Sequence, residues 1–84
     1  MVALNEVRVG QSGIVEAIDL PEDVSHHLAH LGFLPGAGIE VLRRAPAGDP
    51  TVYRLDGVEV GLRQETARHI RVQLTSNSNK TERS

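Results

Sequence analysis

The stretch Leu31-Gly32-Phe33-Leu34-Pro35-Gly36 decides how the first half of this chain folds. Glycine adopts left-handed backbone conformations without steric cost, so Gly32 is well placed to end a helix. Pro35 and Gly36 are the residues that a type II turn favours at its two central positions. The stretch therefore predicts a helix that stops at Gly32 and a tight turn into a strand.

The residues before this stretch have the pattern of a short amphipathic helix. Asp19 is placed to cap it, with Pro21 in the first turn and Glu22 as the partner of a capping box. Apolar side chains recur at i, i+4 and i+7 and predict one buried face, formed by Val24, Leu28 and Leu31.

Five short stretches predict strands: 13–18, 37–44, 51–55, 58–62 and 70–74. Stretch 13–18 carries apolar residues on both faces, which predicts burial on both. Asp56-Gly57 lies between two β-rich stretches and predicts a type I′ hairpin turn, because that turn needs positive φ at both positions. Residues 64–67 suit a single helical turn.

These elements predict a mainly β fold: a small SH3-like barrel of five to six strands. Closing a sheet removes exposed strand edges, which favours a barrel. One α-helix is inserted after the first strand, and a short helical turn precedes the last. The predicted domain spans residues 1–74. Residues 75–84 contain no apolar side chain. They cannot bury enough surface to offset their ordering entropy, so we expect a disordered polar tail.

Composition excludes several classes of function. The chain has 84 residues, no Cys and a net charge of −2. Its scattered Arg residues and only two aromatics, Phe33 and Tyr53, argue against nucleic-acid binding. It has neither an apolar run of about 18 residues nor a signal peptide, so we expect a cytoplasmic protein that does not insert into membranes. Ser12 and Ser25 lie outside any nucleophile motif, and we expect no enzyme activity.

Four histidines raise the question of a metal site. His26 and His30 are four residues apart and share a helix face, with Glu22 a further four residues back as a candidate third ligand. Three alternatives remain open: a functional Fe²⁺ site, adventitious Zn²⁺ binding that bridges molecules, and a plain polar face favoured by the helix dipole. No cofactor is expected to be required. His27 is expected to be partly buried and His69 exposed.

The two turn-rich stretches are candidates for docking a partner. In 45–50, two prolines bracket Gly48-Asp49, which makes the loop stiff. A stiff loop can be a structural connection whose prolines lower the entropy of the unfolded chain. It can also be a docking loop that loses little entropy when a partner binds. We expect Leu34 to be inside the protein and Phe33 to be partly exposed. The predicted partner-binding residues are Phe33, Leu34, Pro46, Gly48 and Asp49.

Three motifs in this order resemble the FeoA family of small ferrous-iron-transport accessory proteins. They are Leu28-x-x-Leu31-Gly32-Phe33-x-Pro35-Gly36, Val41-x-Arg43-x-Ala45-Pro46-x-Gly48-Asp49-Pro50 and Leu62-Arg63-x-x-x-Ala67. The resemblance runs from about Leu4 to Leu74. It implies an SH3-like barrel and a cytoplasmic, non-enzymatic adaptor that docks on the transporter FeoB, whose cytosolic part is a GTPase.

Two further functions stay open at this point. A similar barrel forms the C-terminal domain of iron-dependent repressors of the DtxR type, but 84 residues leave no room for their helix-turn-helix. One alternative is a metal-responsive regulatory domain that binds Fe²⁺ or another divalent metal. The other is a self-associating scaffold, which would form a weak homo-oligomer.

Overall fold

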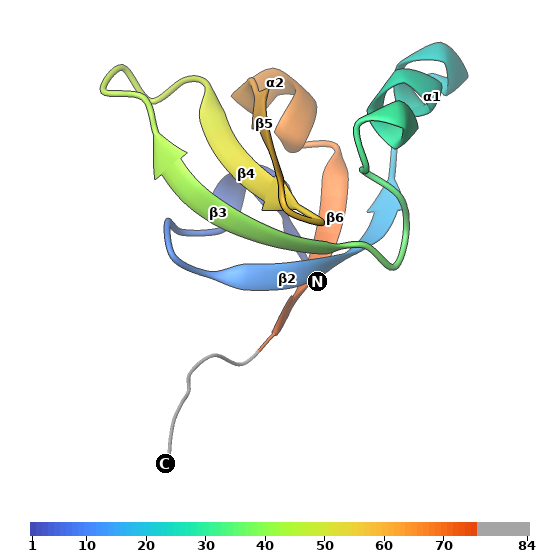
Figure 1. The fold of residues 1–84 in the computed structure, drawn as a ribbon. Coiled ribbons are helices and arrows are strands. Elements are labelled where there is room, and N and C mark those ends of the chain that lie inside the picture. The colour runs from blue at the N-terminus through green and yellow to red at the C-terminus, as the bar shows by residue number, and fades with distance from the viewer. Residues whose placement is uncertain (76–84) are drawn as a thin grey trace.

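The computed structural model describes residues 1–75 as one curled antiparallel sheet with three short helices (Figure 1). The strand order is β1-β6-β2-β3-β4-β5. The strands are β1 (Val2–Ala3), β2 (Ser12–Ile18), β3 (Gly38–Arg44), β4 (Thr51–Leu55), β5 (Val58–Leu62) and β6 (Ile70–Thr75). The helices are η1 (Leu4–Glu6), α1 (Glu22–His30) and α2 (Gln64–Ala67). The predicted mainly β class, with one helix and one helical turn, is confirmed.

The N-terminal segment adds a strand that the sequence pattern did not predict. β1 is only two residues long and pairs with β6, and the buried side chains of Leu4 and Val7 follow it. β1 and β5 are the two edges of the sheet, and the segments that follow them, η1 and α2, contact each other. The contact between these two helical turns therefore links the ends of the two edge strands.

Two irregularities let the sheet curl. The register of β2 against β6 shifts between Val15 and Ala17, and that of β3 against β4 shifts between Val41 and Arg43. A bulge bends its strand and increases the local twist. β2 can therefore pair with β3 along its first half and with β6 along its length.

Gly32 ends α1 as predicted, with φ +108°. Its N–H donates to the Ala29 carbonyl and the Phe33 N–H donates to the Leu28 carbonyl, at 3.0 and 2.9 Å. This pair of bonds is a Schellman motif, which satisfies carbonyls that the helix end leaves free. The type II turn is also confirmed: Gly36 has φ +94° and the Ala37 N–H donates to the Leu34 carbonyl.

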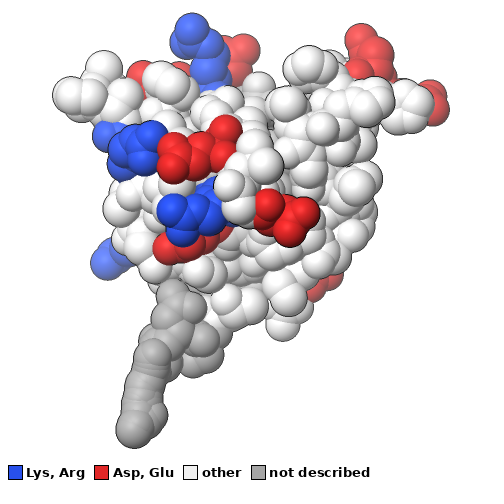
Figure 2. Space-filling model, viewed as in Figure 1, with Lys and Arg blue, Asp and Glu red and all other residues white. Residues whose placement is uncertain are grey.

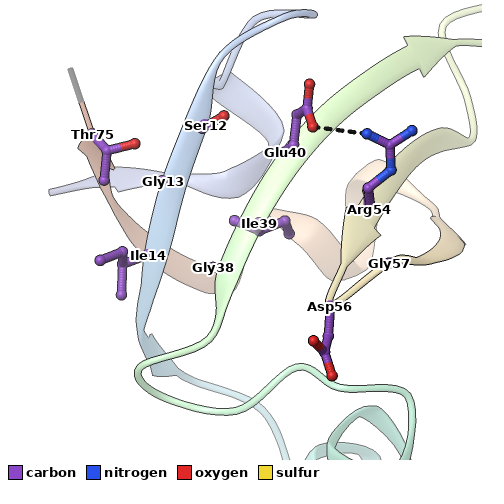
Figure 3. A pocket seen from close by; sticks show the side chains of 10 residues that line it. All are labelled: Ser12, Gly13, Ile14, Gly38, Ile39, Glu40, Arg54, Asp56, Gly57 and Thr75. Atoms are coloured by element: carbon purple, nitrogen blue, oxygen red, sulfur yellow. Dashed lines mark hydrogen bonds and ion pairs between the residues drawn. The ribbon is translucent and has the colours of Figure 1, made fainter. Parts of the chain in front are cut away.

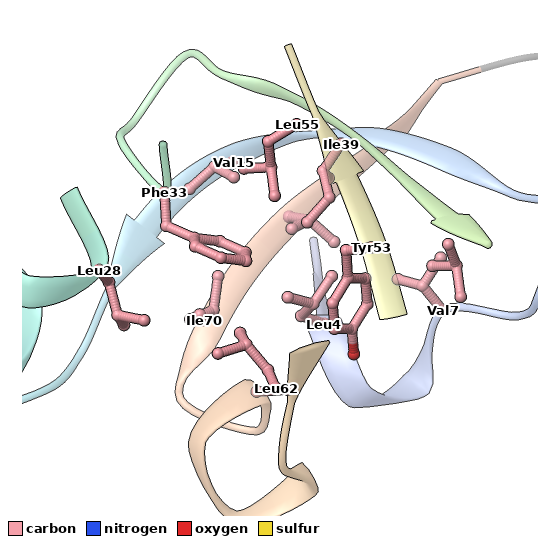
Figure 4. Packing of buried hydrophobic residues seen from close by; sticks show 13 residues of the cluster. Leu4, Val7, Val15, Leu28, Phe33, Ile39, Tyr53, Leu55, Leu62 and Ile70 are labelled. Carbon is pink, nitrogen blue, oxygen red and sulfur yellow. The ribbon is translucent and has the colours of Figure 1, made fainter. Parts of the chain in front are cut away.

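The chain reversal at Gly32 sends Phe33 into the core and Leu34 out of it, the opposite of our prediction. Phe33 has no exposed surface, whereas Leu34 is 50% exposed. Phe33 meets Tyr53 edge to face, with ring centroids 6.4 Å apart and an interplanar angle of 85° (Figure 4). The core cluster consists of Leu4, Val7, Val15, Leu28, Phe33, Ile39, Val41, Tyr53, Leu55, Leu62, Ala67, Ile70 and Val72.

Several details of α1 differ from the prediction. The helix begins at Glu22 after Pro21, without a side-chain cap, and the Asp19 N–H instead donates to the His69 carbonyl. Asp19 therefore continues the pairing of β2 with the chain before β6. Leu28 is the buried residue of α1, while Leu31 lies beyond the helix end and is 36% exposed.

Three other burial predictions were wrong. β2 is buried on one face only, because Ile14 projects outward and is 41% exposed. The predicted partial burial of His27 and exposure of His69 are reversed: His27 is exposed and His69 is half-buried.

The remaining local predictions hold. Asp56 and Gly57 have φ values of 51° and 82°, as a type I′ turn requires, and α2 is a single turn at Gln64–Ala67. Thr75 is the last residue of β6, and the rest of the predicted disordered tail lies outside the described residues. No helix within residues 1–75 is long and apolar enough to cross a membrane.

We predict that Gly32→Ala lowers the free energy of unfolding by about 1–3 kcal/mol, the usual cost of an unfavourable backbone conformation. The new Cβ would meet the Leu55 Cβ at an ordinary 3.5 Å, so the cost lies in the backbone. Urea unfolding measures the loss. Gly38→Ala is the control, since its Cβ meets nothing within 4 Å. Equal stability of the two variants would contradict the assignment of Gly32 as the helix stop.

We also predict that stability falls as the pH rises above about 10. Burial raises the pKa of the Tyr53 phenol above 10.0 and outweighs the lowering effects of the Thr51 hydroxyl and the Arg44 guanidinium. The unfolded chain therefore releases the phenol proton at a lower pH than the folded protein does. The contribution of the neutral phenol to the free energy of unfolding is complete below about pH 10 and is lost as the pH rises from the unfolded to the folded pKa. Tyr53 is the one tyrosine of the chain, so tyrosinate absorbance follows it directly. A Tyr53→Phe variant with an unchanged alkaline loss would assign the effect to other groups.

Candidate functional site

The predicted partner-binding residues do not form one surface. Leu34 lies just before β3, and the loop with Pro46, Gly48 and Asp49 lies just after it, so the two groups are at opposite ends of that strand (Figure 1). Phe33 is buried and unavailable to a partner. The loop and the turn must therefore be considered separately.

The loop 45–50 is fastened to α2. Gln64 is the first residue of α2, and its backbone N–H donates a hydrogen bond of 2.9 Å to the Asp49 Oδ1. In return, the Gln64 Nε2 donates to the Gly48 carbonyl at 2.8 Å. Asp49 thus supplies a cap that Arg63, the residue before the helix, does not provide. These contacts favour the interpretation of the loop as a stiff structural connection.

An apolar groove lies at the other end of β3, between the turn after α1 and the β4–β5 hairpin. Its volume is about 520 Å³. Leu55 is buried at its base, and the exposed Leu34 forms one wall. The groove is lined by Gly32, Leu34, Ala37, Gly38, Leu55 and Asp56. A hollow of this size is within the range of pockets that hold small ligands or a few side chains.

A second, shallower hollow of about 360 Å³ continues from the groove over the outer face of the sheet (Figure 3). The two share Gly38 and Asp56. Because Gly38 has no side chain, a gap is left between the exposed Ile14 and the side chains of β4. The hollow is lined by Ser12, Gly13, Ile14, Gly38, Ile39, Glu40, Arg54, Asp56, Gly57 and Thr75.

Charges near the groove are mostly paired. Arg54 contacts Glu40 at 3.1 Å and Arg43 contacts Glu59 at 2.8 Å, all on exposed side chains. Figure 2 shows acidic and basic groups side by side on this face. Within residues 1–75, Asp56 has no ion-pair partner. Its exposed carboxylate is therefore the uncompensated charge at the rim of the groove.

The candidate metal ligands lie elsewhere, on α1. The rings of His26 and His30 have centroids 6.4 Å apart and an interplanar angle of 51°, and both residues are exposed. In the part of the chain that the structure describes, no three His, Asp or Glu side chains are grouped so as to hold a metal. Glu22 does not complete the pair in this conformation.

Sequence reasoning missed the two residues that join the hollows. Gly38 was placed in a strand with no particular role, and Asp56 was used only as a turn residue. A glycine within a strand often marks a bulge or the close approach of a ligand or another backbone. Gly38 could therefore have indicated a binding hollow at this point. The position of Asp56 beside Leu34 depends on tertiary structure and left no local pattern.

We predict that Asp49→Ala lowers the free energy of unfolding by about 1 kcal/mol, the usual cost of losing a helix cap. Urea unfolding measures the effect. Asp49→Asn is the matched control, because it keeps the acceptor oxygen and should retain most of the stability. Equal losses in both variants would show that the hydrogen bond to Gln64 is not the cause.

Residues 2–74 match the family model of the FeoA domain. A fusion of Fe²⁺ transport protein A with the Fe²⁺ transporter FeoB, from Porphyromonas gingivalis, is 31% identical over 75 residues. The match covers 89% of this chain but only 9% of that relative.

Solved structures of FeoA proteins share the fold. The FeoA protein of Chlorobium tepidum has a TM-score of 0.86 and 29% identity, covering 93% of this chain and 74% of the other. The zinc complex of FeoA from Stenotrophomonas maltophilia, a prokaryotic SH3 domain protein, has a TM-score of 0.74 and 25% identity, covering 87% and 91%. The SH3-like fold predicted from the turn motifs is thereby confirmed, and the chain belongs to the FeoA family, which is associated with ferrous iron transport.

Proposed function

We propose that this chain is a non-enzymatic accessory protein of ferrous iron uptake that docks on the cytosolic part of a FeoB-type transporter. The observation that carries the proposal is the relative in which a domain similar to this one and FeoB are parts of one protein. Fusion holds two modules at a high effective concentration, so that even a weak contact between them is populated. A separate chain of the same family must make that contact by its own binding surface.

We place this surface on the apolar groove. Together, the exposed Leu34 and the open apolar hollow beside it form an apolar patch of the kind that interaction sites use. Val58, at the start of β5, is 57% exposed and extends the apolar area of the same hairpin. The groove is formed by backbone turns with fixed geometry, so little ordering is needed on binding.

The occupant is a segment of the transporter that presents an apolar side chain next to a basic one. The apolar side chain would fill the hollow over Leu55, and the basic group would face Asp56. Glu40 and Arg54 beside it are already paired with each other, so Asp56 is the group that selects a positive partner.

The proposal assigns no chemical reaction to the chain. The Ser25 Oγ donates to the Leu20 carbonyl, which ties this hydroxyl to the entry of α1. Docking on the cytosolic side of a transporter places the chain in the cytoplasm. Any effect of the chain on the transporter would follow from binding alone.

Gly38→Val tests the groove, because it adds a side chain where both hollows meet. Its Cβ meets nothing within 4 Å, and Gly38 lies in a strand, where valine is favoured. We predict at least a tenfold weaker affinity for the purified cytosolic part of a FeoB-type transporter, measured by isothermal titration calorimetry, with unchanged stability. Leu34→Ser should weaken binding in the same direction.

Gly61→Val is the matched control, a strand glycine of β5 outside the groove with only ordinary contacts around its Cβ. It should bind as the parent chain does. Pro46→Ser tests the rival loop surface and should also leave the affinity unchanged. Loss of binding in the Pro46 variant together with retention in the Gly38 variant would move the docking surface to the loop.

A further inference from the structure

The edge strand β5 leaves part of its backbone without a partner. Bonded and non-bonded pairs alternate along an antiparallel ladder, and the two-residue turn at Asp56-Gly57 makes Leu55–Val58 a bonded pair. Glu59 and Gly61 therefore occupy non-bonded positions, and their N–H and C=O groups point away from β4. Both residues are exposed, and no turn, loop or cap hydrogen bond among residues 1–75 reaches their backbone.

The two edges of the sheet differ in how they are protected. β1 has two residues, so little chain can pair with it. β5 has five residues and contains no Pro, Lys or bulge, which are devices that commonly blunt an edge. Its one charged side chain, Glu59, pairs with Arg43 of β3 at 2.8 Å, so the carboxylate lies over the sheet and not along the free edge. β5 is therefore the edge to which a further strand can add.

The inner face of β5 is apolar and opens toward the hairpin turn. Leu62 is buried, Val60 is half-buried and Val58 is 57% exposed, and alternation along the strand puts all three side chains on the core side. A strand added beside β5 would place every second side chain on this face. In this mode of recognition, main-chain hydrogen bonds give affinity, and pockets for alternate side chains give specificity.

Charge indicates what such a strand carries. The β4–β5 hairpin, residues 51–62, contains one Arg and two acidic residues, and the Asp56 carboxylate has no ion-pair partner within residues 1–75. A second copy of the chain would bring the same acidic hairpin to this edge. Complementarity therefore favours a segment with a basic residue, which matches the transporter segment proposed for the groove.

We propose that this transporter segment binds in an extended conformation, as an additional strand on β5 that is hydrogen-bonded to the backbone of Glu59 and Gly61. Its alternate apolar side chains lie on the face of Val58, and its basic residue lies near Asp56. The inference rests on the proposed docking on a FeoB-type transporter and adds the conformation of the bound segment. Recognition then depends on the segment's alternate positions and on its basic residue.

Gly61→Pro tests the added strand, because proline removes an N–H donor from the free edge and leaves the bonded pairs with β4 in place. Gly61 has no positive φ, and its Cβ would meet nothing closer than 4.0 Å, so the variant should fold, as edge strands accept such a proline. We expect about tenfold weaker affinity for the purified cytosolic part of a FeoB-type transporter, measured by isothermal titration calorimetry, since an acceptor of the segment is left unpaired. Gly61→Val is the matched control, because it keeps the N–H, and it should bind as the parent chain does.

Amide hydrogen exchange on the unmodified chain provides a second readout. The amides of Glu59 and Gly61 should exchange rapidly in the free chain and about tenfold more slowly, or slower still, when the transporter part is bound. The amides of Val58 and Val60 already pair with β4 and should change little. If Gly61→Pro loses its fold, the exchange result decides.

Equal affinities of Gly61→Pro and Gly61→Val, with unprotected amides at Glu59 and Gly61 in the complex, would overturn the added strand and leave docking in the groove intact. A parent chain that does not bind the transporter part would overturn both proposals. Protection of the same two amides by a higher concentration of the chain alone would assign the edge to a second copy and overturn the added transporter strand.

Discussion

The left-handed residue Gly32 is the constraint on which the rest of this structure depends. It ends α1 with two backbone hydrogen bonds and reverses the chain, so that Phe33 enters the core. Phe33 then packs edge to face on Tyr53 of β4, which fixes the helix end to a strand more than twenty residues away in the chain. Aromatic pairs of this geometry contribute beyond their buried area. A side chain at position 32 would strain the element that holds the helix and the sheet together.

The same reversal creates the surface to which we assign function. With Phe33 inside, Leu34 is forced outward, and the Pro35-Gly36 turn carries the chain directly into β3. The side chains of Leu34 and Ala37 therefore face the β4–β5 hairpin across a gap that Gly38 leaves open. The features that stabilise the fold and the features that form the groove are the same few residues. The first family motif, which is dominated by turn residues, therefore overlaps the surface that we propose for docking.

The sequence predicted those parts of the structure that obey local rules. The helix stop at Gly32, the hairpin at Asp56-Gly57 and the single turn of α2 depend on backbone preferences of one to four residues, and all three are confirmed. β1 was missed because two residues show no periodicity. The orientation of Phe33 and Leu34 was predicted wrongly because apolar residues that follow a left-handed position do not continue the helical pattern.

The candidate site was harder to predict, since it depends on contacts between distant segments. Asp49 was selected as a docking residue, but its carboxylate caps α2, fifteen residues further along the chain. Gly38 and Asp56, which join the two hollows, belong to elements whose local sequence indicates only a strand and a turn. Only Leu34 of the predicted partner-binding set lines the groove.

The most direct test of the central claim is an amide NMR titration of the labelled chain with the cytosolic part of a FeoB-type transporter. The account predicts shifts centred on Leu34, Ala37, Gly38 and Asp56, with the amides of 45–50 unaffected. Shifts confined to 45–50 would contradict it. The absence of any shift at a large molar excess of the transporter part would contradict it as well.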